Sequence, residues 1–319
     1  MPFTPQSLAW PGDRAILLVH GIGNTQTGGG EDIEGAVRTA LGAAAADIAI
    51  YQLWYDGIND WFMGKTQAAA IVNPLVQLFK HGGSGDALSQ TIAEYAGDVL
   101  WPVLSTAARS AVRQAYITQL VQMVRDGATA GLAADELRMT IIAHSLGCFH
   151  TYEALHEVCR NPMHTLQPAT HHVQFKNVIV MASPVQLVRT VAGQMGAAVP
   201  DPASLATLQG TALSMPAQRR MDGIVVPATT NWVSITGDLD PVGGHLMRNK
   251  ITQAYANIPG QRSIFDTQPA LNIGNEGDLA AALRASLRDR KPPAVTVNDP
   301  HSWTAYVGRH AADLAQWVA

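Results

Sequence analysis

The stretch MTIIAHSLGC, residues 139–148, runs from an apolar segment into a tight turn around Ser145 and on into a segment that can form a helix. A strand, a sharp turn, a serine and a helix in this order present a serine hydroxyl as a nucleophile above a sheet edge. Small residues on both sides, Ala143 and Gly147, let strand and helix approach; alanine stands where glycine is common. The pattern predicts a catalytic serine, and a serine that merely caps a helix is the alternative.

Short apolar runs alternate with longer helical segments along the chain. The runs AILLV, TIIA and NVIVM are almost continuously apolar, as expected for parallel strands that are covered by helices on both faces. This alternation predicts an α/β fold with a mostly parallel central sheet and right-handed crossovers. The strands that we expect are 15–19, 48–54, 138–143, 176–181, 231–236 and 295–297.

The clearest predicted helix is 106–125, in which apolar residues recur every four positions from Val112 to Val124. Gly127 stands just beyond this range, where a glycine commonly ends a helix. Two further helices are expected at 147–159 and 304–318.

Two stretches, 57–104 and 185–230, are too long to be simple crossovers. The first contains plausible helices at 65–80 and 87–100, and the second is rich in Ala, Gly, Pro and Met. We expect one domain over 1–319, with both stretches inserted at one end of the sheet. They form either a cap or lid over an active site or extra packing helices without a gating role.

The stretch ILLVHGIGNTQ, residues 16–26, places glycines directly after the first expected strand. The tetrahedral intermediate of acyl transfer needs two fixed N–H donors. We expect these to be the backbone N–H groups of Ile22 and Leu146, with Gly21 and Gly23 letting the backbone turn toward the site. A nucleotide-phosphate loop is the rival interpretation, but neither G-x-G-x-x-G nor G-x-x-x-x-G-K-[ST] spacing follows.

Two aspartates, Asp238 and Asp240, follow the expected strand 231–236. A carboxylate is needed to orient a catalytic histidine and to stabilise its charged form. We favour Asp240, which precedes Pro241, over Asp238. The alternative for either residue is an aspartate that stabilises a turn.

Of the 11 histidines, His301 has the position that a catalytic base requires. It follows the expected strand 295–297 and precedes the last helix, so it enters above the sheet edge. His245 follows Asp240 too closely to be its usual partner. The pair His171-His172 has no nearby cysteines or spaced carboxylates, so no metal site is predicted there.

The chain order Ser145, Asp240, His301 is the order of α/β-hydrolase triads. With its HGIGN and HSLG motifs, the sequence resembles the α/β-hydrolase superfamily, close to bacterial lipase- and esterase-like serine hydrolases. The likeness runs from Ala15 to the final helix and is weak across 57–104 and 185–230.

This resemblance implies a serine hydrolase that cleaves carboxylic esters through an acyl-enzyme, with helical cap or lid insertions and neither metal nor organic cofactor. The substrate would be a small-molecule or lipid ester. An amidase, peptidase or thioesterase would use the same triad, and a non-catalytic binding scaffold is the alternative from another class.

Composition limits the partners and the location. With a net charge of −4 and a pI of about 6.2, the chain does not predict the basic face that nucleic acid needs. No apolar run reaches the length of a membrane span. The start of the chain lacks the pattern of a signal peptide, so we expect a cytoplasmic protein, with a processed secreted form as the alternative. Cys148 and Cys159 are too far apart on one helix for a disulfide. The oligomeric state is not predicted.

Overall fold

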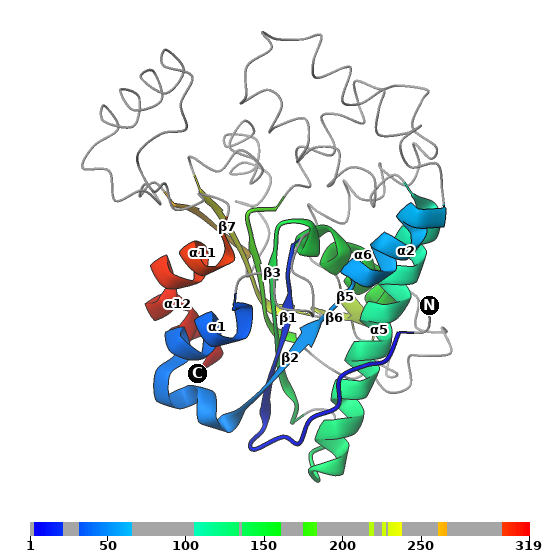
Figure 1. Ribbon diagram of the computed structural model, residues 1–319. Helices are drawn as coiled ribbons and strands as arrows, with labels where there is room; N and C mark the ends of the chain where they lie inside the picture. The colour runs from blue at the N-terminus through cyan, green and yellow to red at the C-terminus, as the bar shows by residue number, and fades with distance from the viewer. Residues whose placement is uncertain are drawn as a thin grey trace, which may run out of the picture.

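A parallel sheet of six strands forms the centre of the structure, in the order β2-β1-β3-β4-β7-β8 (Figure 1). The strands are β1 (Arg14–Val19), β2 (Ile48–Leu53), β3 (Arg138–His144), β4 (Phe175–Met181), β7 (Thr229–Gly237) and β8 (Gln261–Asp266). Two short strands, β5 (Ala217–Arg219) and β6 (Val225–Pro227), pair separately and antiparallel. The computed structural model describes residues 3–21, 32–65, 105–133, 136–160, 175–183, 217–219, 225–227, 229–237, 261–266 and 302–319.

Helices cover both faces of this sheet (Figure 1). On one face lie α5 (Thr106–Thr129) and α6 (Leu146–Arg160), with α2 (Asp56–Lys65) against α5. On the other face lie α1 (Ile33–Leu41), α11 (Trp303–Arg309) and α12 (Ala311–Val318), and a short 3-10 helix, η1 (Gly42–Asp47), follows α1.

Strand β1 illustrates why the inner strands of the sheet are rich in apolar residues. Leu17 and Val19 pack with α5 and α6, whereas Ile16 and Leu18 pack with α1, α11 and α12, because successive side chains of a strand point to opposite faces. None of these four side chains is exposed to solvent. Burying each one contributes about 1.5–3 kcal/mol, so both faces of the strand stabilise the core.

The predicted α/β fold with a parallel central sheet is confirmed, and five of the six expected strands are present with ends shifted by at most two residues. The sixth, 295–297, lies outside the described residues. Strand β8 was not expected, because its sequence QRSIFD mixes polar and apolar residues without a continuous apolar run. Strands β5 and β6 fall within the predicted insertion 185–230.

Two helix predictions need correction. Helix α5 continues through Gly127 to Thr129, so this glycine does not end the helix. A Cβ on Gly127 would lie 2.6 Å from Leu137 Cδ2, which shows that the glycine permits close packing instead. The predicted helix 304–318 is two helices, because His310 leaves the helical range with φ −104° and ψ 21°.

The two predicted insertions are only partly described. Helix α2 occupies the start of the first, and the rest of that stretch, 66–104, lies outside the described residues. The same holds for 184–216 of the second. The single domain over 1–319, the expected helices 65–80 and 87–100 and the lid therefore stay predictions.

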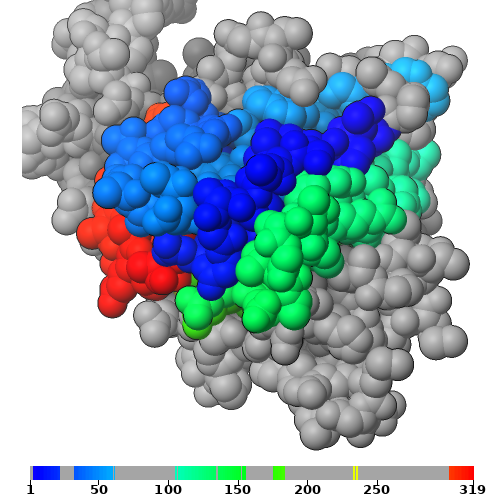
Figure 2. Space-filling view, turned by 90° about the horizontal axis from the view of Figure 1, so that it is seen from below, coloured from blue at the N-terminus to red at the C-terminus, as the bar shows by residue number. Residues whose placement is uncertain are grey.

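The amino-terminal segment runs beside α5 and is fastened to it by polar contacts (Figure 2). Asp126 accepts hydrogen bonds from Ser7 Oγ at 2.8 Å, from the Leu8 N–H at 2.9 Å and from Tyr51 Oη at 2.8 Å. Trp10 Nε1 donates to the same Tyr51 hydroxyl at 2.8 Å. These bonds join the segment to β2 and α5 on the face of the sheet that α5 covers.

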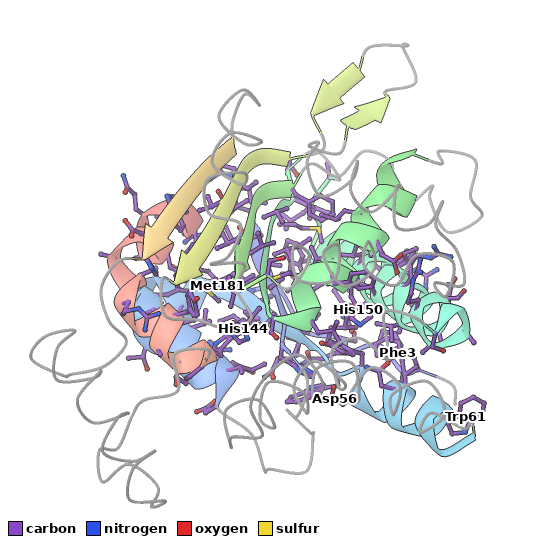
Figure 3. All side chains as sticks on the ribbon, turned by 90° about the horizontal axis from the view of Figure 1, so that it is seen from above. Phe3, Asp56, Trp61, His144, His150 and Met181 are labelled. Carbon is purple, nitrogen blue, oxygen red and sulfur yellow. The ribbon has the colours of Figure 1, made fainter. Side chains whose placement is uncertain are left out.

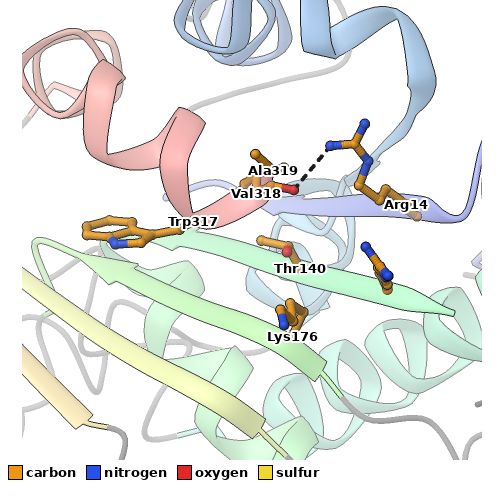
Figure 4. A pocket seen from close by; sticks show the side chains of 8 residues that line it. Arg14, Thr140, Lys176, Trp317, Val318 and Ala319 are labelled. Atoms are coloured by element: carbon orange, nitrogen blue, oxygen red, sulfur yellow. Dashed lines mark hydrogen bonds between the residues drawn. The ribbon is translucent and has the colours of Figure 1, made fainter. Parts of the chain in front are cut away.

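A small pocket lies at the amino ends of the strands, lined by Arg14, Arg138, Lys176 and the last residues of the chain (Figure 4). Arg14 Nη1 donates to the Val318 carbonyl at 3.5 Å. Because Ser145 follows the other end of β3, this pocket is no part of the candidate site. Among the described helices, none is long and apolar enough to span a membrane.

Candidate active site

Ser145 occupies a strained turn between a strand and a helix. Strand β3 ends at His144 and α6 begins at Leu146, so the turn consists of Ser145 alone. Its φ is 53°, a left-handed conformation that costs a non-glycine residue roughly 1–2 kcal/mol. Two bonds hold it there: the Ser145 N–H donates to the Met181 carbonyl, and the Ser145 carbonyl accepts from the Cys148 N–H, each at 3.0 Å. Strain of this kind gathers at functional sites.

Two glycines bring the end of β1 against this turn. A Cβ on Gly21 would lie 2.7 Å from Ser145 Cβ and 3.2 Å from its Oγ. A Cβ on Gly147 would overlap the carbonyl oxygens of Val19 and His20. Both positions therefore exclude any larger residue, and Gly21 lies directly beside the serine.

The first residue of α6 is Leu146, the predicted oxyanion donor. The first N–H groups of a helix have no partner within it, and the positive end of the helix dipole lies there. Ser145 is 5% exposed, so charge developing on a bound group would be only weakly screened by water. This arrangement suits a serine whose attack creates an oxyanion.

The structure leaves the other predicted site residues untested. Ile22, Asp238, Asp240 and His301 lie outside the described residues, so the triad and the second oxyanion donor stay predictions.

The described residues next to the predicted acid and base lie at the edge of the sheet where Ser145 lies. Strand β7 ends at Gly237, directly before Asp238, and is joined to the segment after β4 by the Ala182 N–H, which donates to the Ile235 carbonyl at 3.0 Å. Ser302, directly after His301, caps α11 by accepting from the Ala305 N–H at 3.2 Å.

His144, beside the nucleophile, faces away from the α6 side of the sheet. Its ring centroid lies 5.8 Å from those of Trp303 and Tyr306, so it packs against α11. Figure 3 shows His144 toward the α1 and α11 side and His150 toward the α2 and α5 side. The His144 ring thus joins the turn to the helix that follows the predicted base.

The sequence did not predict a buried polar cluster on the α6 side of the turn. The ring of Tyr55 is stacked on His20, with centroids 4.9 Å apart and planes 6° apart, and contacts His150 edge-on at 4.8 Å. Asp56 Oδ2 lies 3.9 Å from His20 Nδ1. Burial lowers the pKa of His20 to about 4 and that of His150 to about 3, so both rings are neutral near pH 7.

A sequence signal for this cluster existed. His20 and Tyr55-Asp56 follow the first and second expected strands directly, and parallel neighbours end at the same edge of a sheet. Only the pairing of β1 with β2 brings them together. Among the described side chains, no group of three or more His, Cys, Asp or Glu residues could hold a metal ion.

No protein-family model and no curated protein matches the sequence. Solved structures are similar to it at low identity. A putative hydrolase from Agrobacterium vitis S4 is 11% identical, with a TM-score of 0.37 over 88% of this chain and 91% of that chain. An α/β serine hydrolase without lid from Xanthomonas campestris is 12% identical, with a TM-score of 0.35 over 91% and 86%. Mouse alpha/beta hydrolase domain-containing protein 10 is 13% identical, with a TM-score of 0.36 over 86% and 90%.

Structural similarity at such low sequence identity and TM-score gives no information about activity. The parallel sheet covered by helices on both faces and the strand–serine–helix turn at Ser145 are features of the chain itself. On these features, the chain has the α/β-hydrolase fold.

Proposed function

We propose that the protein is a serine hydrolase that cleaves carboxylic esters through an acyl-enzyme, with Ser145 as the nucleophile. One observation carries the proposal: Ser145 is held at φ 53° on a strand-to-helix turn, with Gly21 packed against its side chain. A capping serine has no need of positive φ, since capping residues usually have extended φ and ψ. Such backbone strain is expected where the hydroxyl must be presented to a substrate.

The proposed reaction uses residues of this chain alone. His301 takes the proton from Ser145 Oγ, which attacks the carbonyl carbon of the ester. The N–H groups of Leu146 and Ile22 hold the resulting oxyanion, and Asp240 orients His301. The alcohol leaves with a proton from His301, and water activated by the same histidine releases the acid.

Three features support this assignment of roles. Leu146 is the first residue of α6, so its N–H points out of the helix end. The strand before Asp240 ends at Gly237, and the helix after His301 begins at Trp303 beside His144. The low exposure of the turn favours electrostatic stabilisation.

The second candidate within this class is an amidase, peptidase or thioesterase, because the same groups would serve each of them. A non-catalytic binding scaffold is the candidate from another class. The strain at Ser145 favours the hydrolase, because strained backbone gathers at functional sites.

The test is turnover of p-nitrophenyl esters over a range of acyl lengths, set beside matching anilides and thioesters. Esters should be cleaved fastest, and the preferred acyl length would give the size of the pocket. Ser145→Ala should lower kcat by several orders of magnitude. Ser105→Ala, which changes a serine that caps α5, is the matched control and should leave kcat unchanged.

Two further results bear on the proposal. Asp240→Asn should lower kcat far more than Asp238→Asn, and the reverse would exchange their roles. Near-normal turnover by the Ser145→Ala variant would overturn the mechanism.

A further inference from the structure

Tyr55 makes two contacts with the residue that precedes Gly21. It lies between the end of β2 and the start of α2, and none of its surface is exposed. Its hydroxyl donates to the carbonyl of His20 at 2.7 Å. Its ring stacks on the His20 imidazole at 4.9 Å between centroids. Tyr55 therefore fixes both the main chain and the side chain of His20.

His20 in turn holds the next peptide group. Its Nδ1 is in hydrogen-bond contact with the carbonyl of Gly21. A carbonyl can only accept, so Nδ1 carries the proton and donates. The burial that lowers the His20 pKa to about 4 keeps the ring neutral and in this role near pH 7.

A peptide group is planar, so its carbonyl and its N–H have a fixed relation. The carbonyl of Gly21 belongs to the same peptide group as the N–H of Ile22, the predicted second oxyanion donor. Whatever orients this carbonyl also orients that N–H. Stabilisation of an oxyanion requires donors already in place before the reaction.

We propose that Tyr55 is a positioning residue for the oxyanion hole: through His20 it holds the peptide group that follows Gly21 in its catalytic orientation. This inference rests on the proposed function. Tyr55 touches no reacting atom.

The place of the His20 carbonyl strengthens the argument. A Cβ on Gly147 would overlap this oxygen, so the carbonyl lies directly against the first turn of α6. The Tyr55 hydroxyl thus bonds to β1 where β1 meets the turn that carries Ser145. Without the hydroxyl, this carbonyl would lose its buried donor and the end of β1 could shift.

The chain offers a matched control. Tyr116, on α5, is equally buried, and its hydroxyl is 3.0 Å from Thr151 Oγ1. Tyr55→Phe and Tyr116→Phe each remove one buried hydroxyl that has one hydrogen-bond partner. Both should lower the urea midpoint to a similar extent. Only Tyr55→Phe should weaken the stabilisation of an oxyanion.

The experiment measures kcat and KM for a p-nitrophenyl ester and the inhibition constant of a trifluoromethyl ketone, which forms an oxyanion on the serine. Removing one oxyanion donor outright costs about 10²–10³-fold in kcat, so misorienting it should cost about 10-fold. Tyr55→Phe should lower kcat by this factor, leave KM within about twofold and weaken the ketone in proportion. Tyr116→Phe should leave all three unchanged.

A second variant serves if Tyr55→Phe does not fold. His20→Phe keeps a ring against Tyr55 but removes the donor to Gly21, so it should give the same loss of kcat and of ketone affinity. Equal kinetics in Tyr55→Phe and Tyr116→Phe would overturn the inference, as would a fall in kcat without weaker ketone binding. A wild-type protein that neither cleaves esters nor binds the ketone would instead overturn the proposed function, and this inference with it.

Discussion

Replacing Gly147 with alanine tests the contact between β1 and the turn at Ser145. Gly147 is the second residue of α6 and does not have a positive φ, so an alanine at this position meets no backbone strain. In a helix this change normally stabilises by up to about 1 kcal/mol. Here the new methyl would overlap the carbonyl oxygens of Val19 and His20, which belong to the main chain and cannot rotate away.

We expect Gly147→Ala to destabilise the protein by about 1–3 kcal/mol, the usual cost of overpacking. The controls are Gly57→Ala in α2 and Gly308→Ala in α11, where a new Cβ would have no atom within 4 Å. These two should be neutral or stabilising. The difference between Gly147→Ala and the controls is therefore about 1–4 kcal/mol.

The assay is urea unfolding followed by circular dichroism, with ester turnover on the same samples. A lower midpoint at unchanged m would show lost stability. Moving β1 away from α6 also displaces Gly21 from Ser145, and a shift near 1 Å can cost about 100-fold in rate. If Gly147→Ala were as stable and active as Gly57→Ala, the described packing around Ser145 would be wrong.

Three further predictions concern the surrounding structure. The pKa of His150 is about 3 in the folded protein against an ordinary 6.5, so between these pH values only the unfolded chain binds a proton at this residue. The free energy of unfolding should therefore fall as the pH is lowered from 6.5. His150→Leu should reduce the slope of this free energy against pH, measured in urea titrations, by up to about 1.4 kcal/mol per pH unit. Arg109 Nη2 lies 2.7 Å from Glu153 Oε1, so Arg109→Met should lower the free energy of unfolding in urea by about 3–5 kcal/mol. Adding Glu153→Gln to this variant should recover part of the lost stability, and no recovery would refute the pairing. Ser105→Ala removes the N-cap of α5 and should cost about 1 kcal/mol of thermal stability, whereas no shift would show that the cap is dispensable.

The strands could be predicted where both faces are buried. In β1 every buried position is apolar, and in β3 most of them are, so the runs AILLV and TIIA stand out without knowledge of their neighbours. Strand β8 lacks such a run, and its pairing with β7 depends on the completed sheet. The prediction at Gly127 failed for a similar reason, because the role of this glycine is set by its packing against Leu137 and Trp10 in the folded chain.

In the candidate site, too, one part could be predicted from local sequence and another part could not. The turn at Ser145 is a local pattern, so ten residues of sequence were enough to expect it. The contact of Tyr55 with His20 requires β2 to lie beside β1 in the register that pairs Val19 with Leu53. No local periodicity encodes that register, so the cluster could only be found in the folded chain.

The most direct test of the account is labelling of the folded protein with a fluorophosphonate, with the adduct located by peptide mass spectrometry. We predict one adduct, on Ser145, that is absent from Ser145→Ala and from wild-type protein unfolded in urea, because reactivity depends on the turn, the base and the oxyanion donors together. Labelling of another serine, or equal labelling of Ser145 in the folded and unfolded states, would contradict the claim that this fold activates Ser145.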